Sequence, residues 1–441
     1  MDTKLSSAEE DEAVQKFVEI IRFPTVSTSA YQDGSYDACA DWLIAEMTAL
    51  NLSPSVIPGV MHKPVVVGTW KGSDPELPSI LLNSHYDVVP AIPEGWTVPA
   101  FEAVVKDGRV YGRGTQDMKC VCVQYLVAIK KLQRAGFTPT RNVHLTYLPD
   151  EEVGGLDGMN VLLQSDWFSD IEVAIALDEG LANEGEQFSI FYGERLPWWV
   201  KFKASGNTGH GSRFIEGTAV EQLVGVTQKV LEFREHQRQV LHGGGRGGAH
   251  ARCSHAVAAK TTLGDVTSMN ITLLRAGTQA GGEDVFNVIP ATAEAAVDIR
   301  VSPQTETNEI ISTLDCWCEE VTKNTFGLGK GQGLQWEFIH ENVVKNHSVT
   351  STDPKDNVWY GIIQQTLANK FSIDLTPQVF PAATDSRFLR VLGVKALGFS
   401  PMRRSPILLH EHDEYLAIDV FVEGCNVFVE VIRALASQNT V

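Results

Sequence analysis

The sequence predicts an α/β fold in which a layered domain with a mixed, mostly parallel sheet is interrupted by a smaller α+β domain. Strand-like and helix-like stretches alternate over the first 195 residues, which is typical of parallel sheets covered by helices. The order then changes to β-α-β-β-α-β, as in split βαβ or ferredoxin-like domains, and the first pattern returns after residue 347. We therefore expect residues 1–195 and 348–441 to form one discontinuous domain, with residues 196–347 inserted into it.

The elements of the discontinuous domain follow from the spacing of apolar residues. Apolar stretches predict strands at 65–70 and 79–89 and a buried strand at 173–180. Strand-like patterns predict further strands at 142–149 and around 394–399. Helical spacing predicts helices at 13–22, 37–50, 120–133 and 359–368.

The inserted domain contains one stretch that fits neither pattern. Its expected elements are strands at 197–206, 268–277, 291–301 and 334–344 and helices at 217–235 and 312–326. Between them, residues 236–260 are rich in glycine and lack periodicity. This stretch lacks the Gly-Lys-Ser/Thr ending of a phosphate-binding loop, and its histidines and Cys253 have no regular ligand spacing. We therefore predict a surface loop there.

Charge and composition exclude several classes of partner. The chain carries 36 Lys and Arg against 55 Asp and Glu, a formal net charge of −19. Such a surface repels phosphate backbones and anionic lipid, so we expect no nucleic-acid and no membrane partner. No apolar run approaches the ~20 residues of a membrane span, and the acidic N-terminus lacks a secretory pattern. Seven scattered cysteines do not suggest a disulfide framework, so we expect a cytoplasmic protein.

Five motifs place metal-binding or proton-accepting side chains near the ends of predicted strands, where open α/β sheets build their sites. In NSHYDVV, His85 and Asp87 are two residues apart on a strand and point to one face. In PDEEVGG, the neighbouring Glu151 and Glu152 point apart, so one can bind a metal while the other reaches a water. The remaining motifs supply Asp117 of GTQDMK, Asp178 of IALDEG and His410 of LLHEHDE.

Each motif, taken alone, also has an interpretation without chemistry. A histidine at a strand end can be incidental, Asp117 suits a helix N-cap, and the acidic run at 150–152 suits a solvated turn. Asp178 ends an apolar run, where a buried carboxylate needs a partner. Together, two histidines and several carboxylates without a thiolate form a ligand set for divalent metals such as zinc.

The order of the motifs resembles the family of two-zinc peptidases and deacylases that includes aminoacylase, acetylornithine deacetylase and glutamate carboxypeptidase. The resemblance is carried by LLNSHYDVVP, GRGTQDMKC, PDEEVGG, ALDEG, ERLPWWV, PAATDSRF and LLHEHDE. It extends from about residue 12 to residue 436, apart from the glycine-rich stretch. Two departures are Tyr86, where a threonine is usual, and Gly211, where an alanine is usual. Neither position supplies a ligand.

The resemblance implies two zinc ions per chain and a role for each matching residue. The implied ligands are His85 and Asp178 for one zinc, Glu152 and His410 for the other, and Asp117 as the bridge. Glu151 would be the general base, and Asp87 would orient the histidine at 85. The peptide bond between Asp117 and Met118 would be cis.

The same resemblance makes the inserted domain a lid and dimerisation domain. His210 of TGHGSR would reach the active site of the other protomer in a homodimer. Arg300 of VDIRV and Asn287 of FNVIPA would bind substrate, since the planar guanidinium of arginine suits a carboxylate.

The activity implied by the resemblance is zinc-dependent hydrolysis of a small-molecule N-acyl-L-amino acid to a carboxylic acid and a free amino acid. A metallo-dipeptidase or carboxypeptidase, or a biosynthetic N-acetyl-amino-acid deacetylase, would use the same metal site. A two-metal phosphoesterase would need more cationic side chains near the metals. A non-catalytic dimeric scaffold would be expected to lack Glu151 or a ligand, yet every one of these residues is present.

Overall fold

The computed structural model of the chain describes residues 3–243, 261–340 and 343–439. The chain divides into two compact units. The first unit combines Met1–Gly193, Ser348–Gln378 and Thr384–Val441, and the second combines Glu194–His347 with the short segment Val379–Ala383. Nothing in the sequence pattern indicates that Val379–Ala383 associates with the second unit.

The first unit is built on an eight-stranded mixed sheet with the strand order β1-β2-β6-β3-β7-β18-β8-β17. The parallel centre consists of β6 (Val143–Leu148), β3 (Ser79–His85), β7 (Val173–Asp178) and β18 (Ala396–Gly398). The flanking strands are β1 (Ser55–Ile57), β2 (Val65–Trp70), β8 (Phe188–Glu194) and β17 (Leu375–Phe380). Pairing is antiparallel between β1 and β2, β2 and β6, and β8 and β18. The predicted mixed sheet with a parallel centre is thus confirmed.

Helices cover this sheet and bury its apolar strands. All seven residues of β3 are buried, as expected for a strand covered on both faces. The long helices of the unit are α1 (Ser7–Ile21), α3 (Ser35–Ala49), α4 (Lys119–Arg134), α9 (Val358–Phe371) and α11 (Ile418–Ala436). Helix α1 begins with a capping box formed by Ser6 and Glu9.

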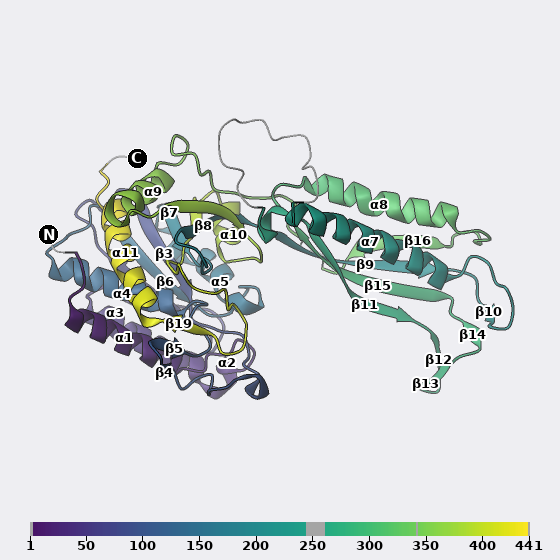
Figure 1. Ribbon diagram of the computed structural model, residues 1–441, viewed down its shortest axis with the longest axis horizontal. Helices are drawn as coiled ribbons and strands as arrows, with labels where there is room; N and C mark the ends of the chain where they lie inside the picture. Colours follow the sequence, from purple (N-terminus) through teal and green to yellow (C-terminus); the bar gives the residue numbers. More distant parts are fainter. Residues whose placement is uncertain (1–2, 244–260, 341–342, 440–441) are drawn as a thin grey trace. The chain divides into compact units, whose positions relative to one another are not determined.

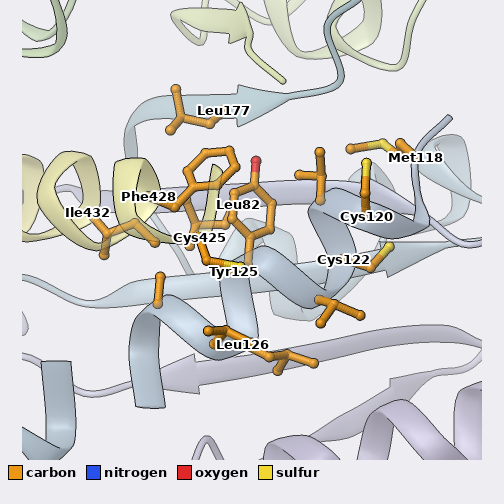
Figure 2. Close-up of a cluster of buried hydrophobic side chains, with 14 of the residues drawn as sticks. Leu82, Met118, Cys120, Cys122, Tyr125, Leu126, Leu177, Cys425, Phe428 and Ile432 are labelled. Carbon is orange, nitrogen blue, oxygen red and sulfur yellow. The ribbon is translucent and has the colours of Figure 1, made fainter. Parts of the chain in front are cut away.

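Helices α4 and α11 pack against each other beside the central strands (Figure 1). Figure 2 shows Tyr125 and Cys122 of α4 in one buried cluster with Phe428 and Cys425 of α11 and Leu82 of β3. The rings of Tyr125 and Phe428 meet edge to face at 4.7 Å. This contact helps to position α4. Asp117 lies just before the N-cap of this helix, Met118.

Shorter elements complete the first unit. The short helices are α2 (Ala30–Asp33), α5 (Met159–Leu163), α6 (Asp166–Ser169) and α10 (Ser386–Val391). The strands β4 (Val104–Lys106), β5 (Arg109–Tyr111) and β19 (Tyr415–Ala417) form a separate three-stranded sheet. Within the described residues, no helix has the length and apolar character needed to cross a membrane.

The second unit contains a four-stranded antiparallel sheet with two helices on one face (Figure 1). Its strands, in sheet order, are β11 (Ser268–Ala276), β15 (Thr292–Val301), β9 (Leu196–Ser205) and β16 (Gly333–Phe338), and its helices are α7 (Ala219–Leu241) and α8 (Thr307–Asn324). The chain order is therefore the expected β-α-β-β-α-β. Along β9, buried residues such as Trp198 alternate with more exposed ones such as Trp199, so only one face of the sheet is covered.

The structure corrects two expectations for the second unit. Helix α7 continues to Leu241, so the first residues of the glycine-rich stretch are helical, whereas 244–260 lie outside the described residues. The predicted strand 334–344 ends at Phe338. Two small antiparallel pairs are also present: β10 (Gly209–His210) pairs with the distant β14 (Val288–Ile289), and β12 (Thr278–Ala280) forms a hairpin with β13 (Glu283–Val285).

Candidate metal centre

Three neighbouring parallel strands bring acidic and histidine side chains to one edge of the sheet. Strand β3 ends at His85, β6 leads into a short turn that carries Glu151 and Glu152, and β7 ends at Asp178 and leads into Glu179. Because parallel strands end at the same edge, these side chains converge although they are far apart in the sequence.

The first of two candidate ligand groups consists of His85, Asp117 and Glu179. The Nε2 atom of His85 lies 3.1 Å from Oδ1 of Asp117 and 3.6 Å from Oε2 of Glu179. All three residues are buried, and their potential ligand atoms lie within 4.8 Å of one another. This arrangement offers one nitrogen and two carboxylate oxygens to a single ion.

The second group consists of Asp117, Glu152 and His410. The Nε2 atom of His410 lies 3.0 Å from Oε2 of Glu152 and 3.3 Å from Oδ2 of Asp117. Asp117 thus faces His85 with one carboxylate oxygen and His410 with the other. That is the geometry of a residue that bridges two ions.

One residue of the expected ligand set lies elsewhere. Asp178 is buried, but its two carboxylate oxygens accept hydrogen bonds from Asn83 Nδ2 at 2.9 Å and Ser386 Oγ at 2.7 Å. The next residue, Glu179, takes the place beside His85, because successive side chains at a strand end point to opposite sides. We therefore replace Asp178 by Glu179 in the proposed ligand set.

The electrostatics of the two groups favour a bound cation. Burial, and then the nearby charge of Asp117, raise the pKa of Glu152 to about 7 and that of Glu179 well above its usual value. In addition, Oε1 of Glu152 is buried and has no hydrogen-bond partner among the described residues. Several buried carboxylates that repel one another are stabilised when a divalent cation lies between them. The nitrogen and oxygen donors fit such an ion without a thiolate.

Glu151 belongs to neither group. It is buried, and burial together with the neighbouring Glu179 raises its pKa well above the usual value for a glutamic acid. The backbone N–H groups of Glu151 and Glu152 donate to the two carboxylate oxygens of Asp87, each at 3.2 Å. The Glu151 side chain thus lies beside the ligand groups without belonging to either of them.

Asp87 therefore has two structural tasks. Its carboxylate accepts from the backbone of the turn at 151–152. The carboxylate of Asp87 also lies 3.4 Å from Nδ1 of His85, and the backbone oxygen of Asp87 lies 3.0 Å from the same nitrogen. A hydrogen bond at Nδ1 directs Nε2 of His85 toward Asp117 and Glu179.

The loop that carries His410 is anchored by a buried ion pair. Glu414 accepts from Arg113 Nη1 at 2.8 Å and from the backbone N–H of Gln116 at 2.7 Å. Arg113 also donates to the backbone oxygen of His410 at 3.2 Å. Glu414 thus joins the segment before Asp117 to the loop of His410. The Asp117–Met118 peptide bond is cis, as the family resemblance suggests.

The other expected site residues lie in the second unit. His210 on β10 is exposed, with Nδ1 2.8 Å from Ser212 Oγ. Asn287 is exposed, and its backbone oxygen accepts from the N–H of Gly211. Arg300 on β15 makes two hydrogen bonds to Asp298, at 2.7 and 3.0 Å. Within the second unit, His210 and Asn287 therefore lie close together.

Comparison with known proteins places these motifs in a family. The profile of "Peptidase family M20/M25/M40" matches residues 81–434. Aminoacylase-1 of Dictyostelium discoideum is 38% identical over 438 residues, covering 98% of this chain and 100% of that protein. Aminoacylase-1 of Mus musculus is 39% identical over 432 residues, covering 98% and 97%.

A solved structure supports the fold. The Bacillus subtilis YXEP protein, described as a dinuclear metal-binding peptidase of the M20 family, superposes with a TM-score of 0.64. The match covers 98% of this chain and 99% of that one at 12% sequence identity. At that identity the likeness concerns the fold alone.

Proposed function

Because the chain belongs to peptidase family M20/M25/M40, we propose that it hydrolyses N-acyl-L-amino acids to a carboxylic acid and a free amino acid, using two zinc ions. The observation that carries the proposal is the pair of ligand groups sharing Asp117, with the buried Glu151 beside them. The similarity to Aminoacylase-1 proteins over nearly the whole chain supports N-acyl amino acids, rather than peptides, as the substrates of this protein.

The proposed ligands are His85, Asp117 and Glu179 for one zinc and Asp117, Glu152 and His410 for the other. When bound, zinc supplies a Lewis acid for the acyl carbonyl and lowers the pKa of a water molecule.

Glu151 is the proposed general base. It takes a proton from the attacking water and later passes this proton to the nitrogen of the departing amino acid. Burial and the neighbouring Glu179 raise the pKa of Glu151 above its usual value, and a higher pKa makes its carboxylate a stronger proton acceptor. Asp87 keeps Glu151 and His85 in place through the contacts described above.

The substrate class is tested by comparing N-acetyl-methionine with methionine-containing dipeptides at equal concentrations. We expect kcat/KM for N-acetyl-methionine to exceed that for the dipeptides by at least about tenfold, a difference of about 1.4 kcal/mol in transition-state stabilisation. Dipeptides hydrolysed at the higher rate would instead identify a dipeptidase, which the same metal centre could serve.

We also propose that the chain forms a homodimer in which His210 serves the partner's active site and stabilises the oxyanion. Its exposure on β10 supports this role, as does the exposure of two large aromatic side chains, Phe214 and Phe286, which flank the β10–β14 pair in sequence. Exposed large apolar side chains often mark protein contacts. Arg300 and Asn287 are proposed to bind the substrate, with Arg300 exchanging Asp298 for the substrate carboxylate.

Mixing two inactive variants tests the shared site. Glu151→Ala and His210→Ala are mixed and allowed to exchange subunits. In a mixed dimer one site has both defects, while the other combines an intact Glu151 with an intact His210. About half of all dimers are mixed, so roughly a quarter of wild-type activity should return. Confirmed exchange without any recovery would assign His210 to its own chain.

We propose a cytoplasmic location because the cysteines of the described residues form no disulfide bonds. Those of the described residues are all free, namely Cys39, Cys120, Cys122, Cys316, Cys318 and Cys425. Free thiols in this number are typical of a reducing compartment.

A further inference from the structure

Lys63, which lies outside every motif of the sequence, forms ion pairs with two residues of the segment that contains Glu151 and Glu152. The Nζ atom of Lys63 lies 2.6 Å from Oδ1 of Asp150 and 2.7 Å from Oδ2 of Asp157. The Lys63 side chain is 11% exposed and that of Asp150 only 5%. The ammonium group thus joins both ends of the segment 150–157 in a shielded position.

The backbone of this segment needs such support. Asp150 has a φ of +74°, which is uncommon for a residue with a side chain. Asp150 also organises the turn, since its backbone oxygen accepts from the N–H of Gly155 and its Oδ2 accepts from the N–H of Asp157. Because Glu151 and Glu152 directly follow Asp150, their positions depend on its conformation.

The residue next to Lys63, Pro64, is contacted by Tyr86, one of the two residues that depart from the family pattern. The hydroxyl of Tyr86, which stands between His85 and Asp87, donates to the backbone oxygen of Pro64 at 2.7 Å. The Tyr86 ring is buried and packs edge to face on Tyr36 at 5.4 Å. A threonine at this position is too short to make this contact. Tyr86 therefore ties the segment of Lys63 to the strand end that carries His85.

Lys63 is the cation of a group that also contains the carboxyl groups of Asp150 and Asp157. Burial alone would lower the pKa of Lys63, but its hydrogen bonds to Asp150 and Asp157 outweigh burial and raise it. Lys63 is therefore a cation that holds two carboxylates, of which Asp150 is nearly fully buried. A buried carboxylate left without its cation is strongly unfavourable, so removal of the ammonium should displace Asp150.

We propose that Lys63, fixed by Tyr86 through Pro64, is a positioning residue that holds Glu151 for proton transfer and Glu152 for metal binding. It acts through Asp150, and its ion pairs are with Asp150 and Asp157 rather than with a residue of either ligand group. The effect on turnover rests on the proposed activity, whereas the effect on metal retention rests only on the proposed metal ligands.

The test compares Lys63→Met with Lys16→Met. Lys16 is a matched control, because its Nζ forms a similarly shielded ion pair with Glu46 at 2.6 Å, between α1 and α3 of the same unit. Asp157→Asn is a milder variant, since Asp157 is 35% exposed and keeps its backbone contact to Asp150. Lys63→Arg restores the charge. For each protein, kcat, KM, melting temperature and the rate of zinc loss to a chelator are measured.

For Lys63→Met we expect kcat to fall roughly tenfold or more and zinc loss to accelerate roughly tenfold, with KM within about twofold. Asp157→Asn should change both rates in the same direction by a smaller factor, and Lys63→Arg should recover part of each. Lys16→Met should lower only the melting temperature. The positioning role is refuted if Lys63→Met matches Lys16→Met in kcat and in the rate of zinc loss. If Lys63→Met fails to fold, the same comparison is made with Asp157→Asn. A wild-type protein inactive on N-acyl amino acids would refute the proposed function, while zinc loss would still test Lys63.

Tyr86→Phe tests the link to Lys63, because it removes only the hydroxyl and keeps the ring against Tyr36. We expect the same changes as in Lys63→Met at about two- to fivefold. In the double variant with Lys63→Met, the fold-changes should be smaller than the product of the single ones, since both act through one turn. Independent, multiplicative effects would remove Tyr86 from the proposal.

Discussion

Replacing Glu151 with alanine is expected to leave both metal ions bound and to lower turnover by at least ~10³-fold. The reason is geometric, since the Glu151 side chain belongs to neither ligand group, although it is buried beside them. Turnover of N-acetyl-methionine and the zinc content by elemental analysis are measured on the same preparation.

Glu152→Ala is the control for this prediction. Glu152 lies 3.0 Å from His410, so its removal should reduce the metal content as well as the activity. Equal metal loss in the two variants would show that the roles of the neighbouring glutamates are assigned incorrectly.

Replacing Glu179 with alanine should lower turnover by about as much as Glu151→Ala does. It should also lower the metal content from two ions toward one per chain. The matched variant is Asp178→Asn, at the neighbouring position. Asparagine keeps an acceptor for Ser386 Oγ, so this variant should retain both metals and lose no more than about tenfold in turnover. Metal loss in Asp178→Asn with full occupancy in Glu179→Ala would restore Asp178 as the ligand.

The choice between Asp178 and Glu179 shows where the sequence stops being informative. Both residues follow the apolar run of β7 in the motif IALDEG, and either carboxylate is a chemically suitable ligand. Their roles differ because Asn83 and Ser386, from other parts of the chain, satisfy Asp178. A single sequence does not reveal such partners. By contrast, the two-residue spacing of His85 and Asp87 already indicates that their side chains meet, although β3 ends at His85 and Asp87 follows it.

The long elements could be predicted because their apolar patterns are regular. Strands β2 and β7 are largely apolar, β3 contains a short apolar run, and β9 alternates clearly between buried and more exposed residues. Helix α11 is harder to recognise, because its segment 427–432 contains β-branched and aromatic residues and is buried on most sides, which also suits a strand. The short segment Val379–Ala383 associates with the second unit through contacts such as Arg195 Nε to the oxygen of Pro381, which no local pattern encodes.

Residues that support the site were also missed for a physical reason. Lys63 acts through charge pairing with Asp150 and Asp157, and its own neighbours in sequence carry no metal ligand pattern. Arg113 lies in the motif GRGTQDMKC, but its partner Glu414 is 301 positions away in the sequence. Glu414 lies in LLHEHDE, where it resembles a further ligand, but it is bonded to Arg113 and to backbone N–H groups.

With the proposed ligands, hydrolysis of N-acyl amino acids is expected to require two bound metal ions per chain. The direct measurement is a zinc titration of chelator-stripped protein, with bound zinc and N-acetyl-methionine hydrolysis recorded on each sample. We expect no hydrolysis without metal and full activity when about two zinc ions are bound per chain. Full hydrolysis by the metal-free protein, or no hydrolysis at two bound zinc ions, would contradict the account.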